Sequence, residues 1–291
     1  MKEKTYYSIG QVSNICKVPI KTLRYYDEIK LLIPNVRKET SNYRYYSKEQ
    51  LITAFMIRQL RALGFNLKDI KDIINENKIE SYIENVKKRM EEIDNEMLEL
   101  KKKRQENECL LQRLGEGQQY LNMDFDTEDP ESMYKIEVIP NMHLLSSRSV
   151  IKSYRNEEVS LERWIAINED ALENNLQIIG SIYVTFHTEL FGQFFSKDCD
   201  IEFAIQVAED TTVNENIRDF GGFEAATVIY KGNYGNIFKT YIALKRWIDE
   251  NEYEVCGNVT EQFLISPIDT RNDDEQVIRI MVPVKSLKKK K

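Results

Sequence analysis

Apolar residues in the first part of the chain recur at helical spacing, and prolines divide them into short segments. Residues 9–16 place their apolar side chains on one helical face, and Ser8 with Gln11 forms a capping-box pattern at the start. Pro19 can begin a second helix, because its missing N–H would have no helical partner there, and Pro34 ends that segment. Two short helices joined by so tight a turn predict a helix-turn-helix.

The segment that follows has strand-like spacing of its apolar residues first and helical spacing after that. "VRKETSNYRYYS" predicts two short strands around a turn whose tip is Ser41–Asn42. Helical spacing returns from Ser47 to Leu63, and "NLKDIKDIINE" predicts one further short helix. We place the end of this first domain, residues 1–76, after that helix.

The clearest periodicity in the chain begins at Ile79 and lasts about five heptads. Successive positions of the pattern lie four and then three residues apart, so their side chains form a seam along one side of a helix. The positions of this seam are Ile79, Ile83, Val86, Met90, Ile93, Met97, Leu100, Arg104, Asn107, Leu111 and Leu114. A long helix that is polar elsewhere needs a partner to bury such a seam, which favours a second copy of the chain over its own C-terminal domain. We therefore predict a dimerising coiled-coil helix over 77–121.

Strand and helix patterns alternate after an acidic, turn-prone linker at 122–130. Within 131–287 the order strand, helix, strand, strand occurs twice. A fixed offset of 77 positions takes Gly180 to Gly257 and Ile201 to Ile278. The fold class is therefore α+β, with a duplicated C-terminal domain that has a cleft between its halves.

The helices of this duplicated domain fit the offset less well than its strands. Helical spacing covers residues 155–175 in the first half and 236–250 in the second. We therefore base the duplication on the strands.

Charge is distributed unevenly along the chain. The protein has a net charge of −7, but residues 1–75 contain 14 Lys and Arg against 7 Asp and Glu, and the remainder contains 27 against 41. A basic head on an acidic body is expected when only the head meets a polyanion. A chance imbalance on a solvated surface is the alternative.

Composition favours a cytoplasmic protein. The sequence has no apolar run long enough to span a bilayer, and its start is too polar for a secretory signal. The cysteines are widely scattered, which argues for a reducing compartment and against a disulfide scaffold. They are Cys16, Cys109, Cys199 and Cys256.

The second predicted helix has one face suited to the major groove of DNA. Leu23 and Tyr26 turn toward the rest of the domain, and Glu28 lies on the outward face of the helix. The remaining outward set is Lys21, Thr22, Arg24 and Tyr25. Arginine and lysine bind guanine edges or phosphates, and a tyrosine hydroxyl donates to phosphate oxygen.

Three residues beyond this helix extend the candidate DNA surface. Tyr43 and Arg44 lie on the predicted hairpin, and Arg61 lies near the end of the following helix. For Tyr26, Tyr45 and Tyr46, ordinary packing is an equally good interpretation.

The first domain resembles the DNA-binding domain of the MerR (mercury-resistance regulator) family. The matching segments are "YYSIGQVSNICKVPIKTLRYYDEIKLLIP", "NYRYYS" and "LRALGFNLKDIKDII". The resemblance implies a winged helix-turn-helix followed by an antiparallel dimerising coiled coil. It also implies DNA contacts, mostly to the backbone, by Arg24, Tyr25, Tyr26, Tyr43, Arg44 and Arg61.

The resemblance also implies a mechanism. Such regulators bind promoters whose two polymerase-recognition elements lie too far apart, and effector binding lets the dimer distort the DNA between them. RNA polymerase is then an indirect partner, and the effector helps to offset the deformation energy of the DNA.

A carboxylate interrupts an apolar strand face in "NVTEQFLIS". Alternation places Val259, Phe263 and Ile265 on one face, with Glu261 among them. A carboxylate there is costly unless it is paired. A lipophilic cation would supply the partner, and aromatic rings would add cation–π contacts. The alternatives are a solvent-exposed strand face and a Lys or Arg that pairs with Glu261.

The C-terminal half resembles the GyrI-like (gyrase-inhibitor-like) effector domains of multidrug-sensing regulators. The matching segments are "VIYKGNYGNIFKTYIALKRWI", "GNVTEQFLISPID" and "VIRIMVPV". By this resemblance Glu261 matches the acidic residue that holds cationic drugs. The aromatic candidates for the same site are Tyr154, Trp164, Tyr183, Tyr234 and Phe263.

Three other functions are weighed against an effector-binding activator. A metal or redox sensor needs soft ligands beside the dimer helix, where this sequence has only Cys109, so we expect no metal site and no cofactor. A small-molecule hydrolase could use Glu261 with Tyr234 as acid and base, but no nucleophile–histidine–acid set is evident, so we expect no enzyme. A protein-docking scaffold would expose the Glu261 strand.

Overall fold

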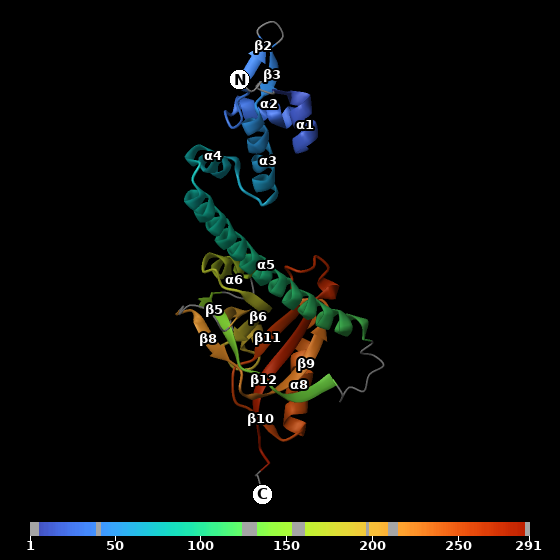
Figure 1. The fold of residues 1–291 in the computed structure, drawn as a ribbon. Helices are drawn as coiled ribbons and strands as arrows, with labels where there is room; N and C mark the ends of the chain where they lie inside the picture. The colour runs from blue at the N-terminus through green and yellow to red at the C-terminus, as the bar shows by residue number, and fades with distance from the viewer. Residues whose placement is uncertain are drawn as a thin grey trace. The chain divides into compact units, whose positions relative to one another are not determined.

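The computed structural model describes residues 6–38, 42–123, 133–152, 161–195, 198–208 and 215–288 (Figure 1). The chain divides into two units, 1–100 and 101–291, and each is described by itself. The first unit is mainly helical and the second is built on an antiparallel sheet, so the predicted α+β class is confirmed.

The first unit begins with a helix-turn-helix and a hairpin. Its elements are β1 (Tyr7–Ser8), α1 (Ile9–Cys16), α2 (Ile20–Glu28), β2 (Val36–Lys38), β3 (Tyr43–Tyr46), α3 (Lys48–Ala62), α4 (Leu67–Glu76) and the start of α5 (Ile79–Asn122). The hairpin β2–β3 projects from the helices (Figure 1). Strand β1, which the sequence did not predict, pairs with β3.

Local sequence signals set the helix starts of this unit. Ser8 and Gln11 form both hydrogen bonds of a capping box at α1, and Ser47 and Gln50 repeat this arrangement at α3. Asn66 accepts from the third residue of α4. The inward faces then bury one core, whose fully enclosed members include Val12, Leu23, Tyr46, Ile57 and Ile70.

Helix α5 is one unbroken helix whose seam has two kinds of environment. In the described chain most seam residues are exposed, with Leu111 at 73%. Val86 packs against the helix-turn-helix core. Leu114, the last seam position, packs instead on Leu264 and Val277 of the C-terminal sheet. The seam therefore offers an apolar surface to a partner along most of its length, and its end belongs to the C-terminal unit.

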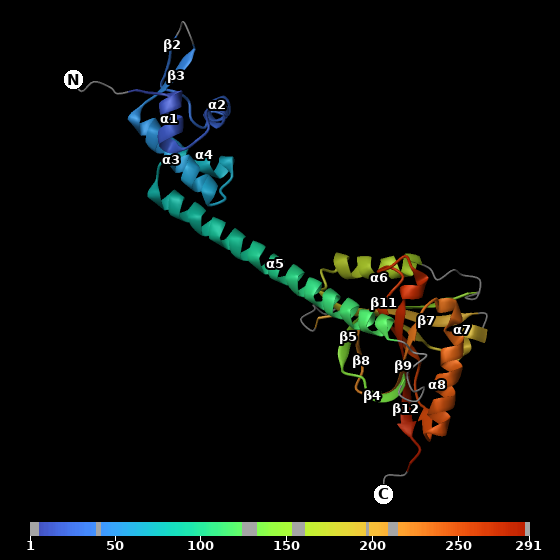
Figure 2. The ribbon, with the colours of Figure 1, turned by 90° about the vertical axis from the view of Figure 1, so that its right-hand side faces the viewer.

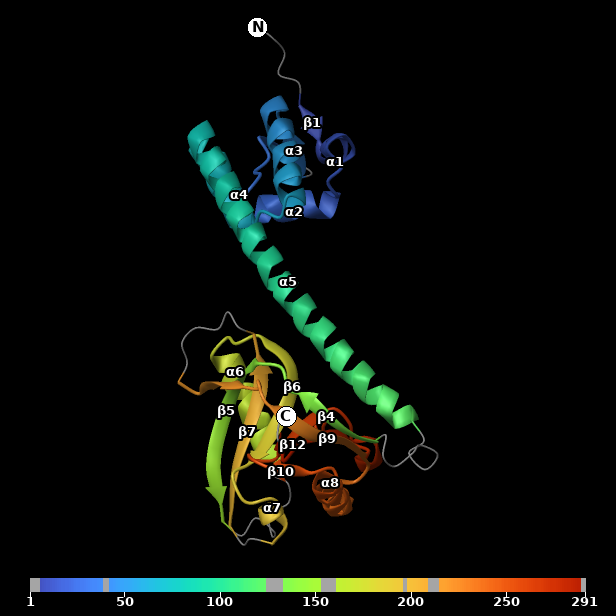
Figure 3. The ribbon, with the colours of Figure 1, turned by 90° about the horizontal axis from the view of Figure 1, so that it is seen from below.

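The second unit contains a nine-stranded antiparallel sheet with two long helices on one face (Figure 2). Its elements are β4 (Tyr134–Val138), β5 (Met142–Ile151), α6 (Leu161–Glu173), β6 (Ile178–Phe186), α7 (Gly192–Phe195), β7 (Cys199–Val207), β8 (Ile217–Phe220), β9 (Glu224–Lys231), α8 (Phe238–Glu250), β10 (Tyr253–Val255), β11 (Thr260–Ile265) and β12 (Val277–Ser286). The sheet order is β4-β9-β12-β11-β6-β7-β5-β8, with β10 beside β12. Figure 3 shows β5 beside β7. Strands β5, β8 and β10 were not predicted.

The offset of 77 positions is a symmetry of this sheet. Central strands β6 and β11 pair with each other, and at their middle Val184 lies directly opposite Glu261, its own equivalent 77 positions later. Helices α6 and α8 end at Glu173 and Glu250, again 77 positions apart. The expectation that the helices fit the offset less well is therefore wrong, because spacing alone placed their ends imprecisely.

The end of α5 packs on the sheet face opposite to α6 and α8. Gly117 lies so close to β11 that an added Cβ would stand 2.5 Å from a side-chain carbon of Ile265. Ile265 faces this helix because the register of β11 shifts between Phe263 and Ile265. The prediction that Ile265 shares a face with Glu261 is therefore wrong.

Candidate functional site

The exposed face of α2 carries the basic and aromatic side chains that the sequence predicted. Lys21, Arg24 and Tyr25 are exposed, and Thr22 is half-buried. Tyr25 is 47% exposed, whereas Tyr26 is 6% exposed and packs in the core. The adjacent tyrosines are thus divided between a surface and a core, and only Tyr25 has its ring at the surface.

A buried aspartate connects α2 to the hairpin. Asp27 accepts from Arg37 at 2.6 Å and from Arg44 at 2.7 Å, and its own side chain is almost fully enclosed. Arg37 and Arg44 face each other across β2 and β3. Arg44, a predicted DNA contact, is therefore held in an ion pair within the unit. The predicted hairpin places the two arginines on facing strands, but no pattern in the sequence placed them beside Asp27.

The two remaining candidates for DNA contact, Tyr43 and Arg61, differ in the contacts that their side chains make. Tyr43 is exposed on β3, with its ring 5.6 Å from that of Tyr45. The Arg61 guanidinium donates to the Phe65 carbonyl at 2.7 Å, just beyond the end of α3. Arg61 therefore stabilises the turn that follows its own helix, and its side chain is still exposed.

Glu261 lies at the centre of the C-terminal unit and is fully buried. Its two carboxylate oxygens accept from different tyrosines, Tyr241 at 2.6 Å and Tyr234 at 2.9 Å. Burial raises the pKa of the Glu261 carboxyl to about 7, and the two tyrosine hydroxyls partly oppose that rise. The carboxyl is therefore close to half protonated at neutral pH.

Aromatic rings surround this carboxylate on the helix-covered face of the sheet. The Phe263 ring stacks on Tyr234 at 6.4 Å between centroids and meets the edge of Trp164 at 4.5 Å. Trp164, Tyr234 and Phe263 thus form one aromatic cluster in which Tyr234 bonds to Glu261 directly, and their role in ligand binding stays a prediction. Tyr241 of α8 was missed, although the offset of 77 from Trp164 points to it.

One predicted ligand-binding residue, Tyr183, is not part of this cluster, and the placement of another is not described. Tyr183 points to the opposite face of the sheet, where its ring lies 5.7 Å from Phe220, and burial raises the pKa of its hydroxyl. Tyr154 lies outside the described residues.

The burial of Glu261 decides between the alternatives for its strand. The side chain is enclosed, so the interpretation of a solvent-exposed strand face is wrong. Within the described part of the chain, its recorded donors are tyrosine hydroxyls and not lysine or arginine. Glu261 is therefore an ionisable group within an aromatic enclosure, and no cationic side chain of the described residues is recorded as its partner.

Comparison with known families covers both units. Residues 7–77 match the model of the MerR HTH family regulatory proteins, and residues 132–285 match that of the GyrI-like small molecule binding domain. This chain carries a MerR-type HTH domain and belongs, through more than half of its length, to the GyrI-like small molecule binding domain family.

Two relatives of this GyrI-like chain come from Bacillus subtilis (strain 168). The multidrug-efflux transporter 2 regulator is 25% identical over 293 residues, which cover 98% of each chain. The multidrug-efflux transporter 1 regulator is 37% identical over 124 residues, which cover 40% of this chain and 44% of the relative. A chain in the cryo-electron microscopy structure of an EcmrR–DNA complex aligns with a TM-score of 0.46 and 24% identity, over 97% of this chain and 100% of that one.

Two other kinds of feature, metal sites and membrane-spanning helices, are absent from the described residues. Among them, no group of three or more His, Cys, Asp and Glu side chains is arranged to hold a metal ion. His187 contacts Glu202 and Asn258 instead. In the same residues, no helix is both long enough and apolar enough to span a membrane.

Proposed function

We propose that this protein is a homodimeric transcription activator that responds to lipophilic cations bound at Glu261. The observation that carries the proposal is a fully buried carboxylate, held by two tyrosine hydroxyls within a set of aromatic rings. A buried carboxylate is costly without a cationic partner. The B. subtilis relatives, named as regulators of multidrug-efflux transporters, support this class of effector.

The pKa of Glu261 gives the site a simple chemistry. With no effector, a proton on the carboxyl removes the cost of a buried charge. A cation that enters displaces this proton and pairs with the carboxylate, while Tyr234 and Tyr241 keep the oxygens oriented. The rings of Trp164 and Phe263 then add cation–π and apolar contacts. The arrangement selects for charge and apolar bulk more than for one exact shape.

We assign the three parts of the chain to three tasks. Residues 1–76 bind promoter DNA through Lys21, Arg24, Tyr25 and the hairpin. Residues 77–121 bring two copies together through the apolar seam of α5, much of which is exposed in a single chain. Residues 131–287 bind the effector, which shifts the dimer toward the state that distorts DNA and so recruits polymerase to a usable promoter.

We propose that the C-terminal unit binds its effector without changing it. Glu261 and Tyr234 form a carboxyl–hydroxyl pair, but the site that surrounds them is built from rings and aliphatic groups. Recovery of an unchanged ligand after prolonged incubation is the expected result. A hydrolysis product that depends on Glu261 would show an enzyme instead.

The decisive experiment compares the wild type with Glu261→Gln, which keeps the shape and removes the charge. We expect tetraphenylphosphonium to bind the full-length wild type and to bind the variant at least about tenfold more weakly in calorimetry. Equal affinity would overturn the assignment of Glu261. Footprinting of the gene's upstream DNA should show enhanced cleavage at the centre of the spacer only when the cation is present, and Arg24→Ala should weaken the footprint with or without it.

A further inference from the structure

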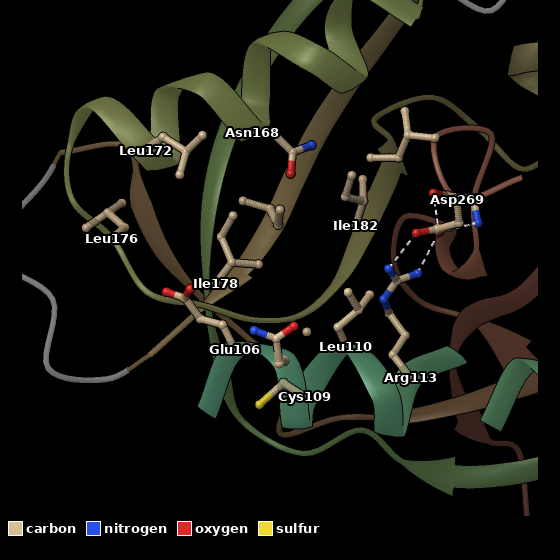
Figure 4. Close-up of a pocket in the computed structure, with 15 residues that line it drawn as sticks. Glu106, Cys109, Leu110, Arg113, Asn168, Leu172, Leu176, Ile178, Ile182 and Asp269 are labelled. Carbon is tan, nitrogen blue, oxygen red and sulfur yellow. Dashed lines mark hydrogen bonds and ion pairs between the residues drawn. The ribbon is translucent and has the colours of Figure 1, made fainter. Parts of the chain in front are cut away.

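A cavity of about 390 Å³ lies between the C-terminal part of α5 and helix α6 (Figure 4). Its size is within the range of small-molecule pockets. The apolar walls are aliphatic, with Leu110 from α5, Leu172 from α6, and Ile178 and Ile182 from β6. Among the described residues that line it, none is aromatic.

Polar groups mark the α5 side of this cavity. Arg113 makes a double ion pair with Asp269, with N–O distances of 2.7 and 2.8 Å, and also donates to the Leu264 carbonyl. Asn107 of α5 and Asn168 of α6 also line the cavity, and each side-chain amide donates to a carbonyl four residues earlier in its own helix. The charged pair is neutral as a unit, and the carboxylate of Glu106 also lines the α5 side of the cavity.

Helix α6 connects this cavity to Glu261. Trp164, Asn168 and Leu172 are four residues apart and therefore share one face of the helix. Trp164 touches Phe263 beside Glu261, and the next two residues along this face line the cavity. The Glu261 cluster and the cavity thus lie under one helix.

The strands beneath α6 make the same connection. Ile182 lines the cavity and pairs directly with Phe263 of β11. Both side chains belong to the core on the face that also holds Glu261. Same-face residues two positions apart on neighbouring strands lie roughly 7–8 Å apart, so the cavity begins about one side chain beyond the Glu261 cluster. The Phe263 ring stands between them.

We propose that the Glu261 cluster and the cavity form one elongated effector site, in which Phe263 is the movable partition. The cationic head pairs with Glu261 among aromatic rings, and a flexible alkyl arm passes Phe263 into the aliphatic cavity. The effectors are therefore amphiphilic cations with a long alkyl arm. The inference rests on the proposed role of Glu261, and it adds a contact between the arm and α5, the helix that leads to the DNA-binding domain.

The test uses the full-length protein and a series of alkyltrimethylammonium ions, with butyl, octyl and dodecyl arms, each below its micelle concentration. We expect affinity to rise about threefold to fourfold for each methylene group that enters the cavity. Leu172→Trp, which narrows the cavity from a largely exposed position, should weaken dodecyl binding at least about tenfold and leave butyl binding unchanged. Ile165→Trp is the matched control, since it is similarly exposed on α6 but does not line the cavity.

Each outcome has a distinct meaning. Equal affinity along the series, with every member weakened by Glu261→Gln, would leave the proposed function intact and overturn the elongated site. The same applies if affinity rises with arm length but Leu172→Trp behaves like Ile165→Trp, because the arm would then lie elsewhere. Unchanged binding of the whole series by Glu261→Gln would overturn the proposed function itself.

Discussion

The two halves of the C-terminal domain share a fold but differ in chemistry at their common centre. Val184 and Glu261 occupy equivalent positions and lie opposite each other on β6 and β11. On the covering helices, Trp164 is equivalent to Tyr241. In the first half the valine packs, and the buried indole N–H has no hydrogen-bond partner among the described residues. In the second half, the tyrosine hydroxyl donates to the carboxylate.

This difference shows how one scaffold serves two tasks. Both halves supply the same apolar burial from the sheet and one helix. The second half adds a carboxylate, and Tyr234 and Tyr241 orient it. If Glu261 binds the effector as proposed, few substitutions add this chemistry to a duplicated fold whose apolar core is already buried.

The largest expected effect on stability comes from giving the first half the carboxylate that the second half has at the equivalent position. Val184→Glu would place a second carboxylate beside Glu261 with no tyrosine arranged to receive it. We expect a loss of about 3–5 kcal/mol in the free energy of unfolding, measured by urea denaturation. Val184→Ile, which keeps the apolar character, is the control and should cost less than about 1.5 kcal/mol. A tolerated Val184→Glu would mean that both halves can house a carboxylate.

The next largest effect is a dependence on pH that only the second half should show. The folded protein holds the Glu261 proton more tightly than the unfolded chain does, because burial raises the pKa from 4.5 to about 7. The stability that this proton contributes is complete below pH 4.5 and is lost as pH rises through 7, by about 3 kcal/mol. Comparison of wild type with Glu261→Gln in denaturation between pH 5 and 8 isolates this loss.

An exposed glutamate on the same sheet serves as the control for that experiment. Glu224→Gln on β9 should leave the pH profile of stability as it is in the wild type. The affinity for the cation should depend on pH in the opposite sense to stability. It should fall about tenfold for each pH unit below 7, since the proton and the cation compete for Glu261. A flat affinity profile would contradict this competition.

The smallest effect separates the two tyrosines. Tyr241→Phe removes a fully buried donor and should reduce stability at pH 8 by about 1 kcal/mol, together with a further rise in the Glu261 pKa. Tyr234→Phe removes a longer hydrogen bond at a less buried position and should cost less. Denaturation of the two variants side by side provides the measurement, and a larger cost for Tyr234→Phe would reverse the order.

The parts of this fold that follow from local signals could be predicted from the sequence. Ser8 and Ser47 mark helix starts through hydrogen bonds to residues three positions away. The heptad pattern of α5 can be recognised because it lies within one continuous helix. The carboxylate at Glu261 was visible because alternation is also local. Its membership in an apolar face could be inferred before any tertiary contact was known.

The missed features depend on contacts between distant residues. Tyr241 reaches Glu261 only because α8 packs on the sheet face to which Glu261 points, and Ile265 changes face because the strand register shifts. Asp27 is buried because Arg37 and Arg44 approach it from another element. Spacing within a segment carries no information about such approaches.

The clamp at Asp27 has a consequence for the energetics of DNA recognition. A long arginine side chain normally gives up rotational freedom when it meets a phosphate, at a cost of about 0.5–1.5 kcal/mol. Arg44 has already given up part of that freedom on folding, since Asp27 holds one edge of its guanidinium. On the proposed DNA surface, part of the entropic cost of ordering Arg44 is therefore met on folding. We expect its contribution to affinity to depend more on enthalpy than that of Lys21 and Arg24, which have no recorded ion pair among the described residues.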